Sequence, residues 1–384
     1  MGVIAPETGR VYYSGLYWND FPIARAEINR RATGDPSLGW YDHFFRSQKR
    51  KFKKVLMLNC GNGWVEREMY GKGYITELVG VDFSEDLLSH ARREAHDLPF
   101  RYYKMDINSA GFPEDGFDLV INHAAGHHIA NINKVFCELL RVMTKDGVFL
   151  NYDYIGPHRN QYPIEQWHAA HVLNLTLPAN VRQIMSYPHL PTMLVTDPSE
   201  AVHSELIMPV MRRYFDLEFF EPVGGALAYI LLTHNQAIQK ASKRDVNKAV
   251  TAIMSADDAY HAAHPAHSMF AYWTGRPRAS VLRSTKKLAA YQQEEDAREE
   301  RAARQGGEYY PHNLIQDLYL ELDELRIAKQ HKEATIGELQ QENDRLRGQL
   351  QDHQHIMRTA SRRTTDMLRR AKRRLGTSIS LKAD

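Results

Sequence analysis

The sequence lacks long apolar runs and recognisable targeting segments. Its longest apolar stretches, such as GALAYILL, are far shorter than the roughly 20 residues that a membrane-spanning helix needs. The first residues, MGVIAPETGR, contain no basic region followed by an apolar core, so no secretory signal is visible. Pro6 stands where a myristoylation signal requires Ser or Thr. A cytoplasmic location is therefore expected.

The sequence is also poor in cysteine and in net charge. Only Cys60 and Cys137 occur among 384 residues, without the spacing of a metal site, and reduced thiols are expected. A hydrophobic content of 43% and a charged content of 25% fit a soluble globular protein. The net charge of +2 is unevenly spread, because residues 358–384 contain nine Lys and Arg against two Asp. The basic character thus belongs to the end of the chain.

Between residues 55 and 154, apolar runs alternate with helix patterns. Continuous apolar runs are typical of strands buried on both faces, and their alternation with helices predicts a parallel sheet covered on both sides. The expected strands cover residues 55–58, 77–82, 100–105, 117–123 and 147–154. The predicted fold class is α/β, with a doubly wound, mostly parallel, seven-stranded Rossmann-like sheet. A ligand site is expected at the C-terminal ends of its strands.

The segments around this core predict the domain organisation. Residues 1–54, with aromatic and polar residues in irregular order, are expected to form an N-terminal cap. The main domain is expected to span 55–236, with a helical insertion at 156–213 where substrate would enter. The run YFDLEFFEPVGGALAYILLTHN, residues 214–236, predicts an antiparallel hairpin that closes the sheet. Residues 237–310 are expected to be a helical linker.

A heptad repeat emerges from Ile315. Stepping alternately by three and four residues places Leu322, Ile336 and Leu350 at a positions and Leu325, Leu339 and Leu346 at d positions, with Asn343 at a. Leu at d with one Asn at a is typical of parallel two-stranded coils. The pattern predicts a coiled coil over 311–357 and a homodimer through 315–357. Lys329 and Lys332 interrupt the seam, so a single solvated helix is the alternative.

The basic tail, residues 358–384, could continue this helix. Its charge predicts docking on an anionic membrane surface, which would make the protein peripheral at the inner membrane face. Nucleic acid is the less favoured partner, because no aromatic residues are interleaved with the basic ones. A solvated, fraying basic end is the remaining alternative.

The stretch VLMLNCGNGWVE, residues 55–66, predicts a site for a nucleoside-bearing cofactor. A strand leads into a turn with glycines at 61 and 63, a helix follows, and Asp82 ends the next strand. A nicotinamide fingerprint requires G-x-G-x-x-G, but Glu66 occupies the third glycine position. A large side chain there would obstruct a pyrophosphate. The stretch therefore favours a cofactor without pyrophosphate.

Four motifs resemble those of class I S-adenosylmethionine-dependent methyltransferases. They are LNCGNGWVE, VGVDFS, KMDINSAGFPEDGFDLVINHAAGHHI and LLRVMTKDGVFLNYDY, which follow one another over residues 55–154. The resemblance implies S-adenosyl-L-methionine as cofactor. It implies that the following residues bind it: Asn59, Gly61, Gly63, Asp82, Phe83, Asp106, Ile107 and Asn122. Asn59 departs from the Asp or Glu usual in the family, so a carboxylate near the cofactor's amino group is missing.

A narrower resemblance concerns the acceptor. YWNDFP, INRRATGDP, NYDYIGPHRNQY and TDPSEAVHSELIMPVM, together with LNCGNGWVERE, look like a bacterial methyltransferase group associated with polysaccharide and glycosyltransferase systems. This likeness spans roughly residues 17–236. It implies a saccharide or glycolipid acceptor.

Methyl transfer to a hydroxyl requires alignment of donor and acceptor and removal of the acceptor's proton. His127 and His128, after the fourth strand, are the candidate general bases, although they could instead cap the next helix. Asp153 and Tyr154 are further catalytic candidates. His158 and Arg159 are candidate substrate-binding residues, the latter for a carboxylate or phosphate. No set of His, Cys and carboxylate residues completes a metal pattern, so no metal site is predicted.

The predicted activity is O-methylation of a saccharide or glycolipid by a soluble methyltransferase. An RNA or small-metabolite methyltransferase is the alternative within enzymes. A scaffold is the alternative of another class, in which Asn59 marks a decayed site and the coiled coil assembles a complex.

Overall fold

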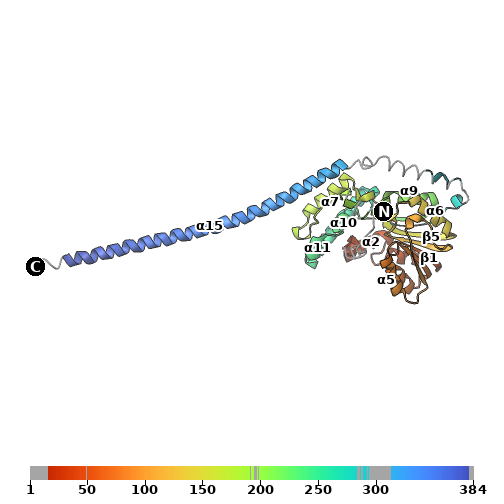
Figure 1. The fold of residues 1–384 in the computed structure, drawn as a ribbon, viewed down its shortest axis with the longest axis horizontal. Coiled ribbons are helices and arrows are strands. Elements are labelled where there is room, and N and C mark those ends of the chain that lie inside the picture. Colours follow the sequence, from red (N-terminus) through yellow and green to blue (C-terminus); the bar gives the residue numbers. More distant parts are fainter. Residues whose placement is uncertain are drawn as a thin grey trace. The chain divides into compact units, whose positions relative to one another are not determined.

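The computed structural model describes residues 16–48, 50–190, 192–193, 197, 199–282, 286, 289–291, 293 and 313–379. The chain divides into two compact units, residues 1–316 and 317–384. The first is an α/β unit, and the described residues of the second belong to one long helix, α15 (Asn313–Ile379). Both are drawn in Figure 1, where α15 is the blue helix.

A seven-stranded sheet forms the centre of the α/β unit. Its strands are β1 (Phe52–Leu58), β2 (Ile75–Asp82), β3 (Phe100–Lys104), β4 (Phe117–His123), β5 (Met143–Tyr154), β6 (Phe215–Gly224) and β7 (Phe270–Pro277). The strand order is β3-β2-β1-β4-β5-β7-β6, and β7 pairs antiparallel with both β5 and β6. The pairs among the first five strands are parallel. The predicted α/β fold class is confirmed.

Helices connect the strands and cover the sheet. They are α2 (Pro22–Thr33), α3 (Trp40–Ser47), α4 (Trp64–Gly71), α5 (Glu85–Ala95), α6 (Ile132–Val142), α7 (Ile164–Thr176), α9 (Ile207–Tyr214), α10 (Ala228–Leu232), α11 (Gln236–Lys240), α12 (Lys243–Ala263) and α13 (Ala279–Leu282). Short 3-10 turns lie at Trp18–Asp20, Ile107–Ser109, Gly126–His128, His158–Asn160, Ala179–Val181, Ser204–Leu206 and Pro265–His267. No helix among the described residues combines the length and apolar character needed to cross a membrane.

The core lies between the sheet and its helices, and aromatic rings fill much of it. Phe136 of α6 packs edge-on against Phe149 of β5, and Phe149 contacts Phe215 of β6. All three side chains are buried. Helix α6 is amphipathic, and its apolar residues recur at helical spacing on the face that meets the sheet. This packing holds β5, whose end carries part of the site, in a fixed position.

The predicted closing antiparallel pair is confirmed, but its second strand is wrongly placed within 214–236. Only its first strand exists, as β6, and the apolar run after it forms α10. The second strand is β7, which lies inside the range predicted as a helical linker. Gly224 and Gly225 have positive φ and turn the chain out of the sheet. An apolar run this short is compatible with a buried strand or a buried helix, and here tertiary contacts select the helix.

The N-terminal helices pack on the same unit. Trp40 of α3 stacks on Tyr152 of β5, with ring centroids 5.6 Å apart. Arg31 of α2 forms a buried ion pair with Asp257 of α12 at 2.6 Å. The predicted cap region therefore forms part of the sheet's covering layers. β1 begins at Phe52, inside the range assigned to the cap.

Candidate active site

The predicted site residues gather at one edge of the sheet. The parallel strands β1, β2, β4 and β5 all end there, at Leu58, Asp82, His123 and Tyr154. Ligands bind beyond the carboxyl ends of strands in sheets of this kind. The loops that leave these strands therefore define the candidate site.

A backbone cradle joins the first two loops. The carboxylate of Asp82 accepts hydrogen bonds from the backbone N–H of Gly61 and of Ser84, each at 2.8 Å. Burial raises the pKa of Asp82. Gly63 has a φ of +78°, and a Cβ there would lie 2.7 Å from the Tyr102 hydroxyl. A side chain at residue 63 would therefore collide with Tyr102 and obstruct the turn.

The remaining residues assigned to the cofactor lie around this cradle. Phe83, next to Asp82, is 55% exposed although it is apolar, so its ring is available to a ligand. Asp106 is exposed and accepts the backbone N–H of Asn108 at 2.9 Å, while Ile107 is buried. Aromatic surface, a carboxylate and an open glycine turn are the groups that an adenosine moiety requires. These residues fit S-adenosylmethionine.

Asn59 links the cradle to the loop after β4. It has a positive φ of 44°, and its side-chain amide donates to the Ala125 carbonyl at 3.3 Å. The amide thus takes a structural role that a carboxylate could not, since a carboxylate has no proton to donate. The Asn that replaces the family's usual carboxylate at residue 59 therefore connects the loop after β1 with the loop after β4.

Asp153 organises the loop after β4. Its Oδ2 accepts hydrogen bonds from the Asn122 side chain at 2.7 Å and from the Gly126 backbone at 2.6 Å. Its Oδ1 lies 2.6 Å from Nδ1 of His127 and accepts the Tyr154 backbone N–H at 2.7 Å. Asp153 is fully buried. It therefore orients the His127 ring through Nδ1, and its own oxygens are not accessible to a methyl acceptor.

The pKa values of the two neighbouring histidines are shifted in opposite directions. Burial works to lower the pKa of His127, but the charge and hydrogen bond of Asp153 outweigh it and raise the pKa to about 9. Burial, together with the neighbouring His127, lowers the pKa of His128 to about 4. Burial also works to raise the pKa of Asp153, but His127 and the hydrogen bonds outweigh it and lower that pKa.

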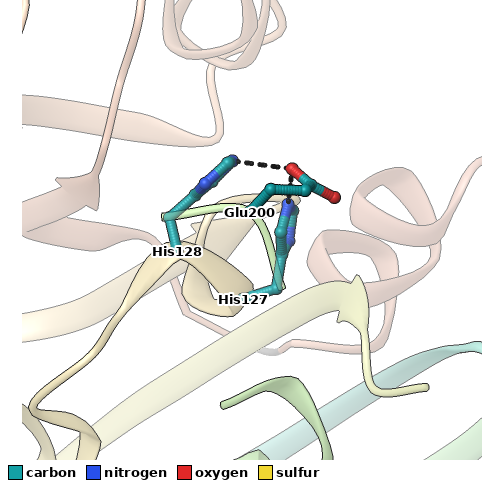
Figure 2. Close-up of side chains that lie close together, drawn as sticks. All are labelled: His127, His128 and Glu200. Atoms are coloured by element: carbon teal, nitrogen blue, oxygen red, sulfur yellow. Dashed lines mark ion pairs between the residues drawn. The ribbon is translucent and has the colours of Figure 1, made fainter. Parts of the chain in front are cut away.

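Glu200 reaches the histidines from the insertion and was missed in the sequence analysis. The Val202 backbone N–H donates to the His127 carbonyl at 3.1 Å, which fastens this segment to the loop after β4. Glu200 Oε2 then lies 3.8 Å from Nε2 of His127 and 3.8 Å from Nε2 of His128. Figure 2 shows both rings turned toward this carboxylate. Glu200 lies within the run TDPSEAVHSELIMPVM, but nothing in that run marks its carboxylate as a site residue.

The residues predicted to bind substrate support the Glu200 segment. Arg159 is buried, and its Nη1 donates to the Glu200 carbonyl at 3.3 Å. His158 forms an ion pair with Glu205 at 2.8 Å. The hydroxyl of Tyr154 donates to the Pro157 carbonyl at 2.9 Å. The structure thus engages Tyr154, His158 and Arg159 in intramolecular contacts beside the site.

Uncommon backbone conformations flank the site. Among the described non-glycine residues with positive φ are Asn59, Ala124, Arg159, Asn160 and Ala201. Such residues cost of order 1–3 kcal/mol each and persist where surrounding structure holds them. The Arg159 backbone N–H donates to the Ala201 carbonyl at 2.7 Å, which ties two of them together. Their gathering here is typical of a functional site.

The chain is similar to known methyltransferases. Residues 56–151 match the family described as methyltransferase domain. An uncharacterized methyltransferase of Bacillus subtilis, YcgJ, is 28% identical over 130 residues, which are 33% of this chain and 50% of that protein. The EEF1A lysine methyltransferase 4 of Bos taurus is 26% identical over 175 residues, 40% of this chain and 66% of that protein. The chain therefore spans half to two thirds of these relatives.

A solved structure of an S-adenosylmethionine-dependent methyltransferase from Mesorhizobium loti has a TM-score of 0.38 at 15% identity. It aligns over 62% of this chain and 96% of that one. The family match over residues 56–151 extends from β1 into β5 and includes the glycine cradle. These residues carry an S-adenosylmethionine-dependent methyltransferase domain.

Proposed function

We propose that this protein methylates a hydroxyl oxygen of a saccharide or glycolipid, with S-adenosylmethionine as the methyl donor. The observation that carries the proposal is the position of His127. Asp153 orients this ring at the same sheet edge as the cradle formed by Gly61 and Asp82. A polar group able to handle a proton thus lies beside the predicted cofactor site.

Different residues of the chain would bind the cofactor, position the loop and handle the proton in such a reaction. Gly61, Gly63 and Asp82 would hold the cofactor, which supplies an activated methyl group when bound. Asn122 and Asp153 hold the loop that carries the histidines. The group formed by His127, His128 and Glu200 receives the acceptor oxygen and handles its proton. A histidine acting directly as general base, as the sequence predicts, is one way to do so.

The surroundings of Glu200 support a polyhydroxylated acceptor. Burial, together with the charge of Glu200, raises the pKa of four tyrosines: Tyr17, Tyr154, Tyr162 and Tyr229. These hydroxyls stay protonated at neutral pH. Tyr154 and Tyr162 are buried, but Tyr17 and Tyr229 are partly exposed. Their aromatic faces and hydroxyls, with the Glu200 carboxylate, can contact both the C–H faces and the hydroxyls of a sugar ring.

Two measurements test the proposal. Calorimetric titration should show cofactor binding, and its absence at millimolar cofactor would favour the scaffold alternative. Mass spectrometry of glycans and metabolites from a deletion strain should show one lost methyl group on a saccharide. A methyl group lost instead from RNA or from a small metabolite would overturn the acceptor class.

A matched pair of variants connects the activity to this site. Asp153→Asn keeps the shape of the side chain but removes the charge that orients His127, and should abolish restoration of the lost methyl group. Asp146→Asn lies on the same strand, is exposed, and should restore it fully. Equal restoration by both variants would remove the Asp153–His127 pair from the mechanism.

We also propose that α15 has two roles. Its heptad positions would pair two chains, and its basic residues from Arg358 onward would bind an anionic membrane surface from the cytoplasmic side. Supporting the first, Ile336, Leu339, Leu346 and Leu350 are more than half exposed. Supporting the second, the described basic side chains of this segment are also exposed.

A further inference from the structure

Three potential metal ligands converge where β4 meets the insertion. One ring nitrogen of His127, one of His128 and a carboxylate oxygen of Glu200 all lie within 4.8 Å of one another. Oε2 of Glu200 is 3.8 Å from Nε2 of each histidine. Figure 2 shows the three side chains facing a common point. The sequence analysis predicted no metal site because Glu200 follows the histidines by some seventy residues.

Outer contacts fix the tautomer of each histidine. Asp153 accepts the proton on Nδ1 of His127 at 2.6 Å. Nδ1 of His128 lies 3.1 Å from the Ser199 hydroxyl, which itself donates to Asp197 at 2.8 Å. Because the Ser199 proton points to Asp197, Ser199 accepts from Nδ1–H of His128. With one proton on Nδ1, each ring presents Nε2 toward Glu200, and an ion bound there takes the place of the second proton that His127 otherwise holds at neutral pH.

This pattern is typical of metal centres. Histidines that bind metals usually donate their other ring N–H to a carboxylate or a similar acceptor, which orients the ring and increases its basicity. Two imidazoles and one carboxylate suit first-row transition metals better than magnesium or calcium, which prefer oxygen ligands. Metal–ligand bonds of roughly 2.0–2.2 Å require donors about 3.0–3.5 Å apart. The two observed nitrogen–oxygen distances of 3.8 Å need a contraction of about half an ångström, and the two ring nitrogens, which lie within 4.8 Å of each other, must also approach.

We propose that His127, His128 and Glu200 bind a divalent first-row transition-metal ion. Three protein ligands leave at least one coordination position open, as in catalytic sites. That position takes the acceptor oxygen, a role that rests on the proposed function. A bound cation lowers the pKa of a coordinated hydroxyl, whose proton then leaves to solvent. The ion occupies the lone pair that a histidine base would use, so metal binding replaces direct base catalysis by His127.

Cobalt titration tests the site directly. The full chain, without a histidine tag and after treatment with a chelator, is titrated with Co²⁺ in the absence of cofactor and acceptor. Visible absorption and elemental analysis should show one tightly bound Co²⁺ per chain. His128→Gln and Glu200→Gln should weaken this binding by roughly 10–100-fold or more. Circular dichroism and thermal unfolding verify that each variant is folded.

Two control variants match these substitutions. His189→Gln removes another histidine of the insertion, which contacts Thr192, and Glu205→Gln removes the carboxylate that pairs with His158. Both should bind Co²⁺ as the unaltered protein does. Equal binding by Glu200→Gln and the unaltered protein would place the ion on other histidines and overturn the site.

Measuring methyl transfer with and without metal tests whether the bound ion coordinates the acceptor oxygen. Activity lost on chelation and restored by Zn²⁺ or Co²⁺ supports coordination of the acceptor. Equal activity of the metal-free and metal-loaded proteins would overturn that role. Because Co²⁺ binding is measured without cofactor, a chain that binds Co²⁺ but not S-adenosylmethionine would refute the proposed function and leave the metal site supported.

Discussion

Asp153 is the residue on which the geometry of the site depends. It accepts four hydrogen bonds, from Asn122, Gly126, His127 and the Tyr154 backbone, while fully buried. Satisfied buried networks are rigid, but a partly satisfied one costs more than an apolar core. Any change that displaces one donor should therefore affect the others.

Gly126 tests this dependence. A Cβ at this residue would lie 2.6 Å from Asp153 Oδ2 and 2.7 Å from the Asn122 amide. Gly126→Ala should lower the free energy of unfolding by about 1–3 kcal/mol through overpacking and reduce methyl transfer strongly. Gly111→Ala is the matched control, because its added Cβ meets no atom within 4 Å. Denaturant unfolding and methyl-transfer assays measure the two effects. Equal changes in Gly126→Ala and Gly111→Ala would contradict the close approach of residue 126 to Asp153 and Asn122.

Glu66 provides a pH-dependent prediction. It is fully buried, and its carboxylate oxygens have no hydrogen-bond partner among the residues that the structure describes. Burial raises its pKa to about 7. Between about pH 4.5 and 7 the folded chain keeps a proton that the unfolded chain releases, so stability falls as pH rises.

Glu66→Gln should remove this fall. At pH 8 the variant is expected to be more stable than the unaltered protein by about 2–3 kcal/mol, and equally or less stable at pH 4. Urea unfolding across this range is the measurement. Glu77→Gln, at a side chain about half exposed, should leave the curve within about 0.5 kcal/mol. A pH-independent difference for Glu66→Gln would show that its carboxyl titrates normally.

Individual site residues were predictable only where they follow strands. Asp82 and Asn122 lie at the ends of strands that the sequence located, and His127 lies in the turn after one of them, so their meeting at one edge follows from parallel pairing. Glu200 could not be predicted in this way. Its position depends on the path of the insertion, which is set by long-range hydrogen bonds such as Val202 to His127.

At the level of elements, β7 is the strand that the sequence analysis did not find. FAYWTGRP follows a His-rich turn and a polar helix, and its aromatic residues were not recognised as a strand. Strands β1, β2, β4 and β5 were predictable because each contains a continuous apolar run between helices, whereas β3, FRYYK, mixes aromatic and charged residues. The last two pair across an excursion through α10, α11 and α12, and no local pattern encodes that pairing.

Asp257 of α12 holds this excursion against the sheet. Its carboxylate pairs with Arg31 and accepts the backbone N–H groups of Gly225, Leu227 and Ala228. Asp257→Ala should lower the free energy of unfolding by about 3–5 kcal/mol, because it removes the buried carboxylate beside Arg31 and leaves three buried backbone N–H groups without this acceptor. Asp258→Ala removes an exposed neighbour and should cost less than about 1 kcal/mol. Similar losses in urea unfolding would show that burial does not distinguish the two residues.

For the whole molecule, the main feature beyond the α/β unit is α15. Its 67 residues correspond to a length of about 100 Å. An isolated helix of this kind gains little from propensity alone and is usually stabilised by packing of its apolar face. The exposed apolar side chains at heptad spacing indicate which face that is. The coiled coil itself stays a prediction.

Pairing through α15 predicts a dimer that depends on its d positions. Leu339→Glu combined with Leu346→Glu places charges in the seam and should convert dimers to monomers. Gln341→Glu, at an exposed position outside the seam, should leave the dimer intact. Analytical ultracentrifugation distinguishes the two masses. A monomeric unaltered protein at all concentrations would exclude pairing.

Membrane docking predicts a dependence on the basic residues of α15. Each contributes about 1 kcal/mol near an anionic surface, so Arg369→Ser with Arg370→Ser should weaken vesicle binding by roughly thirtyfold. Flotation with vesicles containing phosphatidylserine measures the effect, and Lys329→Ser, outside the basic segment, is the control. Unchanged flotation would remove the membrane role. Salt-sensitive binding to RNA but not to vesicles would replace it with nucleic acid.

The late arrival of β7 also affects how the chain is made. β5 and β6 have emerged by residue 224, but the strand that fits between them begins at residue 270. At about 5–20 residues per second on the ribosome, a few seconds pass in which both edges are open to pairing with other chains. The nascent domain is most exposed to misassembly in this interval. Translation speed and chaperone access over residues 225–277 should therefore determine the yield of folded protein.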